Sequence, residues 1–150
     1  MPSKKSVTCK YLFYRYTMRN GTVRTLLLPL VHVRIESPEE HIETDALVDS
    51  GATRTLIPKE IAEILPSLKY EEQRAEVTGA GGVFLARVTR LKKLTLIKNI
   101  TPFAHFVEIE VLVPDHEGIL PYVILGRDYV FRRFDITFHE KRRKLTFTEI

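Results

Sequence analysis

The distribution of apolar residues predicts a chain built mainly from short β-strands. Segments 7–18 and 22–36 are rich in Tyr, Phe, Val, Thr and Leu, which favour strands. They flank Asn20-Gly21, a pair that tolerates positive φ and is typical of a hairpin turn. More strands are expected along the rest of the chain, at residues 41–49, 70–78, 83–91, 93–97, 104–113 and 122–125, with a closing hairpin from 134–138 and 145–150.

Helix is expected in two places. Pro58 suits the first position of a helix, an apolar stripe follows it, and Pro66 ends the segment. A second short helix is expected near Arg127. Many short strands with so little helix indicate a single all-β domain over residues 1–150, a folded sheet or closed barrel with one or two short helices.

The composition is that of an ordinary globular protein. Of 150 residues, 44% are hydrophobic and 28% are charged, so a normal core can form. Cys9 is the only cysteine, which excludes an intrachain disulfide and a cysteine cluster for zinc. The longest apolar run, 26–31, is far below the roughly 20 residues of a membrane helix, and the N-terminus lacks the pattern of a signal peptide. We expect a soluble, cytoplasmic protein without membrane contact.

The formal net charge of +4 is unevenly distributed along the chain. Seven basic residues and no acidic residue precede Glu36, whereas residues 36–72 hold ten acids and three bases. A second basic cluster lies at 141–144. Basic clusters are one mark of nucleic-acid binding. No motif of interleaved aromatic and basic residues accompanies them, so solvated strand ends are the favoured interpretation and nucleic acid the disfavoured one.

Three local features carry candidate chemistry. In the first, an apolar strand delivers Asp49 into a turn at Ser50-Gly51, where the glycine permits a sharp bend. Alone, this pattern is more typical of an ordinary turn. In the second, three glycines within 79–82 form a hairpin tip that could close over a ligand or be a plain flexible turn. No lysine or helix follows it, unlike a P-loop. In the third, the strand 123–125 runs into Gly126.

In this order, the three features resemble the retropepsin-like aspartic proteases, the single-lobe relatives of pepsin. The resemblance extends to the closing hairpin and covers about residues 30–150, while residues 1–25 form an N-terminal β-hairpin extension that is longer than the family minimum. The matching motifs are Asp49-Ser50-Gly51-Ala52, Gly79-Ala80-Gly81-Gly82 and Ile124-Leu125-Gly126-Arg127-Asp128.

The resemblance implies a homodimer with one lobe per chain that cleaves polypeptides without a metal or cofactor. It assigns roles to three groups of residues: catalytic Asp49 with the active-site loop Ser50, Gly51, Ala52 and Thr53; a flap that binds substrate, Gly79, Ala80, Gly81, Gly82, Val83 and Phe84; and pocket walls and supports, Leu56, Ile57, Ile124, Gly126, Arg127 and Asp128.

Arg127 and Asp128 have further expected contacts. In the family, the arginine at the position of Arg127 pairs with a carboxylate just beyond the catalytic turn. This chain has Thr53 and Arg54 there, so the partner of Arg127 is open. Arg54 could instead favour an acidic group of the substrate. Asp128 is expected to cap the helix that follows it.

The chemistry of such an enzyme requires a second carboxyl group. As is known for aspartic proteases in general, the two groups lie about 3 Å apart and share one proton. Asp45 is the nearest candidate in the chain, but four residues of strand separate it from Asp49 by about 13 Å. A two-fold axis at the Asp49 turn would supply the second carboxylate from another copy.

The sequence favours other functions less. The five histidines show no metal-ligand spacing, and Ser50 as a nucleophile would need a histidine base nearby. A catalytically silent retropepsin-like module for dimerisation or peptide binding is the main alternative. A nucleic-acid binder is the third.

Overall fold

The computed structural model describes residues 4–79 and 82–150. Strands dominate it, and the two helices are one turn each. In chain order the elements are β1 (Ser6–Lys10), β2 (Leu12–Thr17), β3 (Val23–Leu28), β4 (Leu30–Glu36), β5 (His41–Val48), α1 (Lys59–Ala62), β6 (Tyr70–Gly79), β7 (Gly82–Lys98), β8 (Thr101–Pro114), β9 (Val123–Leu125), α2 (Val130–Arg133), β10 (Phe134–His139), the 3-10 helix η1 (Glu140–Arg142) and β11 (Lys144–Glu149).

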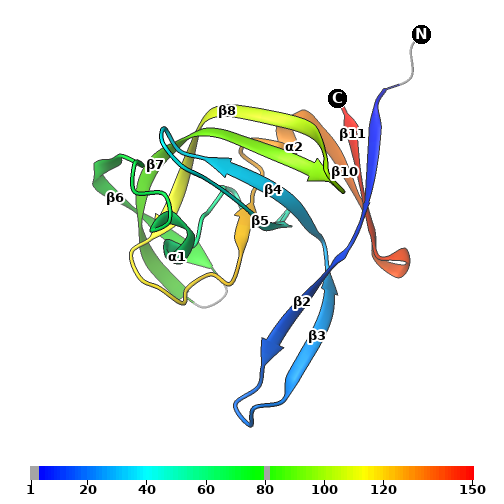
Figure 1. Ribbon diagram of the computed structural model, residues 1–150, viewed down its shortest axis with the longest axis horizontal. Helices are drawn as coiled ribbons and strands as arrows, with labels where there is room; N and C mark the ends of the chain where they lie inside the picture. The colour runs from blue at the N-terminus through cyan, green and yellow to red at the C-terminus, as the bar shows by residue number, and fades with distance from the viewer. Residues whose placement is uncertain (1–3, 80–81) are drawn as a thin grey trace.

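The main sheet is folded around the core (Figure 1). Its strands follow the order β6-β7-β4-β5-β9, and β8 pairs with β7. Leu56 forms single-residue bridges to Leu112 on β8 and Ile124 on β9, which connects the two ends of the ring β8-β7-β4-β5-β9. The all-β prediction is confirmed. Among the described residues, these two bridges join the ends of the folded sheet.

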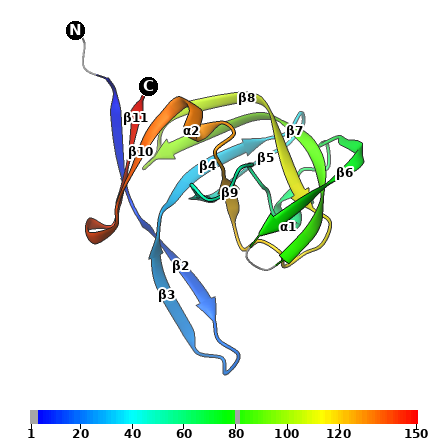
Figure 2. The same cartoon turned by 180° about the vertical axis from the view of Figure 1, so that it is seen from behind.

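The N-terminal segments differ from the prediction in where they break. Segment 7–18 divides at Tyr11, because β1 pairs with β11 whereas β2 pairs with β3. Segment 22–36 divides at Pro29, which has no N–H to donate to a strand ladder and whose carbonyl accepts from Val48 N at 3.0 Å. The hairpin at Asn20-Gly21 is therefore made by β2 and β3. We call residues 12–28 the arm, since they extend away from the body in both views (Figures 1 and 2).

The first helix is shorter than predicted, and the second begins later than predicted. Pro58 takes the N-cap position of α1, and after Ala62 the chain continues in tighter turns, with Leu65 N donating to Ala62 O at 3.0 Å. The second helix begins at Val130 with Tyr129 as its N-cap, and no side chain caps it. The expectation that Asp128 caps this helix is wrong, because its carboxylate is used elsewhere.

The core lies between the inner face of the main sheet and the sheet β1-β11-β10. Val31, Val33 and Ile35 alternate inward along β4 and are fully buried. Phe134 and Phe147 of the three-stranded sheet belong to the same core cluster, with their ring centroids 5.7 Å apart. This packing holds both chain ends together and gives β4 and β5 a rigid support. Within the described residues, no helix has the length and hydrophobicity needed to cross a bilayer.

Candidate functional site

Asp49 lies where two parallel strands end together. Strand β5 pairs with β9 in parallel, with Val48 opposite Leu125, and Asp49 N then donates to Leu125 O at 3.1 Å. The two strands are about 75 residues apart in the chain, so residues from both of its halves fix the position of this one carboxylate.

The turn after Asp49 orients its carboxylate. Gly51 N donates to Asp49 Oδ1 at 2.9 Å, and Ala52 N donates to Asp49 O at 3.2 Å. A Cβ at residue 51 would lie 3.2 Å from the same Oδ1, so glycine keeps the space that this bond needs. Asp49 is half-buried and Ser50 is exposed. One carboxylate oxygen is thus held by a charge-assisted hydrogen bond, and no hydrogen bond to the other is seen among the described residues.

A second segment crosses the turn at very close range. A Cβ on Gly126 would lie 2.3 Å from the carbonyl oxygen of Arg54 and 2.8 Å from its nitrogen, which no side chain could do. Arg127 N donates to Ala52 O at 2.9 Å. Leu56 continues the brace, since its N–H donates to Ile124 O at 2.9 Å. The turn is therefore held on both sides by backbone contacts with β9 and the residues after it.

An ion-pair network fixes the outer side of the turn. Arg54 contacts Glu110 through Nη2 and lies 3.5 Å from Asp128 through Nε. Asp128 also accepts hydrogen bonds from Thr55 N at 2.9 Å and Thr55 Oγ1 at 2.7 Å. Arg127 is exposed and forms no ion pair in the described part of the chain.

This network answers the open question about Arg127. The two segments that were expected to be joined by Arg127 and a carboxylate are joined with the charges exchanged, because Arg54 follows the Asp49 turn and Asp128 follows Gly126-Arg127. The guanidinium of Arg54 is already engaged by two acids. A contact of Arg54 with an acidic group of the substrate stays a prediction.

Asp128→Asn is expected to destabilise the protein by about 1–3 kcal/mol, since it weakens a charged acceptor that serves three donors. Urea unfolding would measure the change. Arg127→Gln is the matched control at the neighbouring position, and its effect should stay within about 0.5 kcal/mol because the side chain is exposed. Equal losses for both variants would contradict the structural role of Asp128.

The β6–β7 hairpin overhangs the same region. Gly79 pairs with Gly82 at its end, and the predicted tip residues Ala80 and Gly81 lie outside the described residues. Val83 is 64% exposed. Phe84 of the hairpin packs in one apolar cluster with Leu56, Leu112 and Ile124, which lie beneath the hairpin. Ile57, by contrast, is fully buried in the main core, where it supports the turn from behind.

Tyr122 is a neighbour of Asp49 that the motifs did not indicate as part of the site. Burial raises the pKa of its hydroxyl, and the nearby Tyr14 and the negative charge of Asp49 raise it further. The rings of Tyr14 and Tyr122 meet edge to face, with centroids 5.3 Å apart. The arm therefore touches the residue that directly precedes β9. No sequence signal links residues 14 and 122, because they are joined only by the folded chain.

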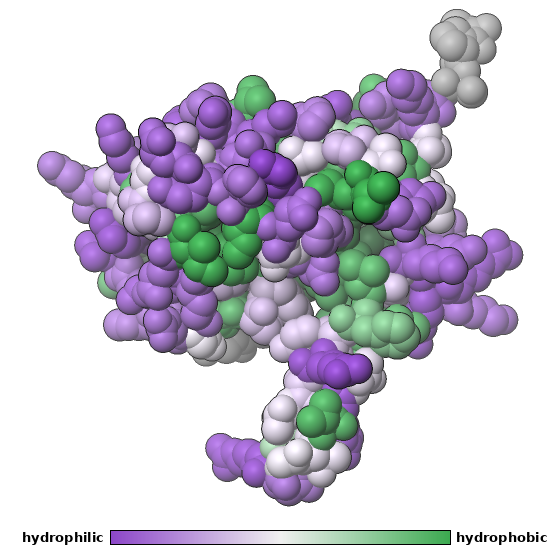
Figure 3. Space-filling view, in the orientation of Figure 1, coloured by the Kyte–Doolittle hydropathy of each residue, from purple (hydrophilic) through white to green (hydrophobic). Residues whose placement is uncertain are grey.

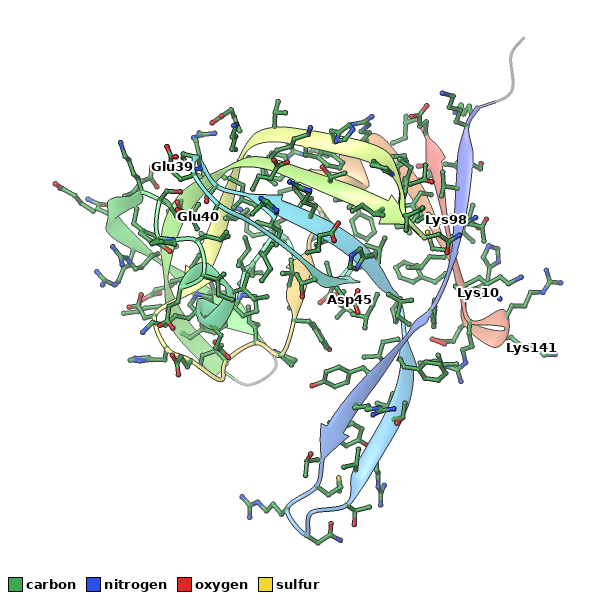
Figure 4. All side chains as sticks on the ribbon, viewed as in Figure 1. Lys10, Glu39, Glu40, Asp45, Lys98 and Lys141 are labelled. Carbon is green, nitrogen blue, oxygen red and sulfur yellow. The ribbon has the colours of Figure 1, made fainter. Side chains whose placement is uncertain are left out.

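The other acids that could pair with Asp49 lie elsewhere in the fold. Asp45 points outward from β5 on the near face in Figure 4, where His32 Nδ1 lies 3.1 Å from its Oδ1. Asp115 pairs with Arg74 at 2.7 Å. Asp135 lies in β10 opposite Thr148. One chain thus presents one carboxylate at this turn among the residues that the structure describes.

Comparison with known proteins agrees with this geometry. A family model described as aspartyl protease matches residues 31–129, which include the turn, the hairpin and the crossing segment. The fold is similar to the crystal structure of a retropepsin-like aspartic protease from Rickettsia conorii, with 18% identity and a TM-score of 0.52 over 99% of this chain and 96% of that one. This likeness shows the fold, and it confirms the retropepsin-like fold that the motifs predicted. Among curated proteins, none matches significantly.

Proposed function

Because this chain belongs to the aspartyl protease family, we propose that it is an endopeptidase in which two copies of Asp49, one from each subunit of a homodimer, activate a water molecule. The observation that carries the proposal is the held carboxylate. Gly51 N–H fixes Oδ1 of Asp49, and the crossing of Gly126 over Arg54 fixes the turn. An ordinary turn has no need of a brace from a strand so distant in the chain.

The reaction needs two carboxyl groups that differ in protonation. Like charges about 3 Å apart cannot both ionise, so a pair of Asp49 side chains would share one proton. The ionised carboxylate removes a proton from the attacking water, while the protonated one donates a hydrogen bond to the carbonyl oxygen of the scissile bond. The fixed Oδ1 keeps each carboxylate in one orientation during the transfer.

The second carboxylate comes from a second copy in this proposal. Asp45 and Asp115 are bound to basic partners away from the turn, and Asp128 is engaged by Arg54 and Thr55 on its outer side. A two-fold axis beside Asp49 brings two identical turns together without any further acid. Exposed Ser50 lies at the surface of that turn, where it could hydrogen-bond to the partner turn and brace it.

The substrate would be an extended polypeptide beneath the β6–β7 hairpin. This hairpin would act as the flap and form β-type hydrogen bonds with the peptide backbone. Exposed Val83 and Leu85 and the apolar cluster around Phe84 favour apolar side chains beside the cleaved bond. Cleavage of a peptide library should show this preference, and a dominance of basic residues next to the scissile bond would reject it.

Digestion of unfolded casein at pH 4–7 tests the proposal directly. The wild type should cleave it and be blocked by a statine inhibitor, which imitates the tetrahedral intermediate. Asp49→Asn should lose activity by about 10²–10⁴-fold or more, since it removes the acid–base group while keeping the shape of the side chain. Asp135→Asn, exposed on β10 in a different sheet, should keep its activity.

Dimer content measured by sedimentation separates the possible outcomes. Asp49→Asn should remain dimeric, because an amide can still hydrogen-bond across the interface. If the wild type and Asp49→Asn were equally inert and both bound peptides, the chain would be a silent binding module and the proposal would be wrong.

A further inference from the structure

The arm extends away from the body, and the rest of the described chain leaves most of its surface uncovered. Its two strands pair from Leu12 opposite Leu28 to Thr17 opposite Val23, and they form a two-stranded sheet of their own. Figures 1 and 2 both show this sheet extending well beyond the rest of the chain. Isolated two-stranded ribbons are at best marginally stable in water, so a ribbon of this kind gains its stability from packing against something.

Apolar side chains cover both faces of the arm. Directly opposed residues of an antiparallel pair share a face, so Tyr14 and Leu26 lie on one face and Phe13 and Leu27 on the other. Phe13 is 72% exposed and Leu26 is 46% exposed. Figure 3 shows apolar side chains at the root of the arm and along its free length. Val23 and Met18, also exposed, extend the apolar surface toward the tip.

The root of the arm is next to the catalytic turn. Pro29 O, one residue beyond the arm, accepts a hydrogen bond from Val48 N at 3.0 Å, and Val48 directly precedes Asp49. Tyr14 also packs edge-on against Tyr122, which directly precedes β9. The apolar surface of the arm is therefore continuous with the residues that lead into the Asp49 turn. An element that begins there and is six residues long per strand reaches about 20 Å outward.

We propose that the arm clasps the second copy of this chain, so that each subunit of the active dimer is held by the arm of the other. The inference rests on the proposed function, in which two Asp49 turns meet at a two-fold axis. A second body placed by that axis must occupy the space beside the turn, where the arm begins. By symmetry both arms then engage, and each gains the apolar cover that its own chain does not give.

The charges of the two surfaces are complementary. The arm carries Arg15, Arg19 and Arg24 and no acid. Near its root, on the outward face of β5, the carboxylates of Glu43 and Asp45 are half-exposed, and Figure 4 labels Asp45 there. Arg34 and His32 of β4 lie directly opposite them, so two carboxylates share this face with one arginine and it is acidic on balance. A basic arm crossing to the partner would meet this acidic surface close to the axis, which favours a second copy over an arm that is free in solvent.

The clasp can be tested by removing apolar surface from the arm. The double variant Phe13→Ser/Val23→Ser should raise the dimer dissociation constant by about 10- to 100-fold, measured by sedimentation equilibrium, since buried aromatic anchors dominate interfaces. Val107→Ser is the matched control. Val107 is 67% exposed and lies opposite Lys93, which pairs with Glu36 at the end of β4 farther from the arm, so the dissociation constant of this variant should not change.

Activity measurements then separate the clasp from other roles of the arm. The double variant should be inactive at concentrations where the wild type is dimeric, and joining two copies by a flexible linker should restore cleavage through a millimolar effective concentration. An unchanged dissociation constant with a raised KM would overturn the proposal, because the arm would then bind substrate. An unchanged constant with unchanged kinetics would also overturn it.

Amide hydrogen exchange of the wild type tests the clasp without any variant that could fail to fold. Amide hydrogen exchange in β2 and β3 should slow as rising concentration converts monomer to dimer, while exchange in β10, on the smaller sheet, should not change. Arm amides that exchange equally fast in the dimer would refute the clasp. An active wild-type dimer with unprotected arms would leave the proposed function standing, whereas a wild type that is inert and monomeric at every concentration would remove both.

Discussion

Mixing wild-type chains with Asp49→Asn chains is expected to lower peptide cleavage with the square of the wild-type fraction. A dimer that holds one carboxylate cannot share a proton between two, so only pairs of wild-type chains are active. In an equal mixture with random pairing, about one quarter of the dimers are of this kind. Initial rates of casein cleavage after subunit exchange would measure the relation at constant total protein.

The control is the same mixture made with Asp135→Asn. Asp135 is exposed on β10, in a different sheet from the Asp49 turn, so these mixed dimers should keep full activity at every ratio. A linear fall with the Asp49→Asn fraction, to about one half in an equal mixture, would mean that each chain works alone. That result would exclude the shared catalytic pair.

Gly126→Ala is expected to destabilise the protein by about 3 kcal/mol or more and to abolish most activity. The added Cβ would lie 2.3 Å from Arg54 O and 2.6 Å from Arg54 C, both backbone atoms that cannot turn aside. The two segments would have to separate, which breaks the bond from Arg127 N to Ala52 O and moves the Asp49 turn. A shift of about 1 Å in such a site costs about 10²-fold in rate.

Urea unfolding and kcat/KM of the folded fraction would measure the two effects of Gly126→Ala. Gly79→Ala serves as the stability control, since no atom lies within 4 Å of a Cβ built there. Its free energy of unfolding should change by less than about 0.5 kcal/mol. Equal unfolding midpoints for the two variants would show that the close crossing is not needed for the fold.

Local turn and strand chemistry was enough to predict most elements of the fold. Asn20-Gly21 forms the expected hairpin, and the glycines of 79–82 connect two antiparallel strands as predicted. The breaks at Tyr11 and Pro29 were not predicted. Strand β1 leaves β2 because it pairs with β11, which lies at the other end of the chain, and no local pattern of residues reports such a partner.

The candidate site was also predictable from the sequence only in part. The position of Asp49 in a glycine turn follows from the motif, because strand, acid and glycine are adjacent in the sequence. The role of Asp128 does not, since local rules assign it to a helix cap and only the crossing of two distant segments brings it to Arg54 and Thr55. The contact of Tyr14 with Tyr122 depends on the same long-range folding.

The parallel pairing of β5 with β9 has a consequence for newly made protein. Asp49 is held by Leu125 and its turn by Gly126 and Arg127, so a nascent chain on the ribosome has its acid long before it has the residues that aim it. Until residues 125–127 have been synthesised, the Asp49 turn has none of these contacts. The order of the strands therefore delays formation of the proposed active site.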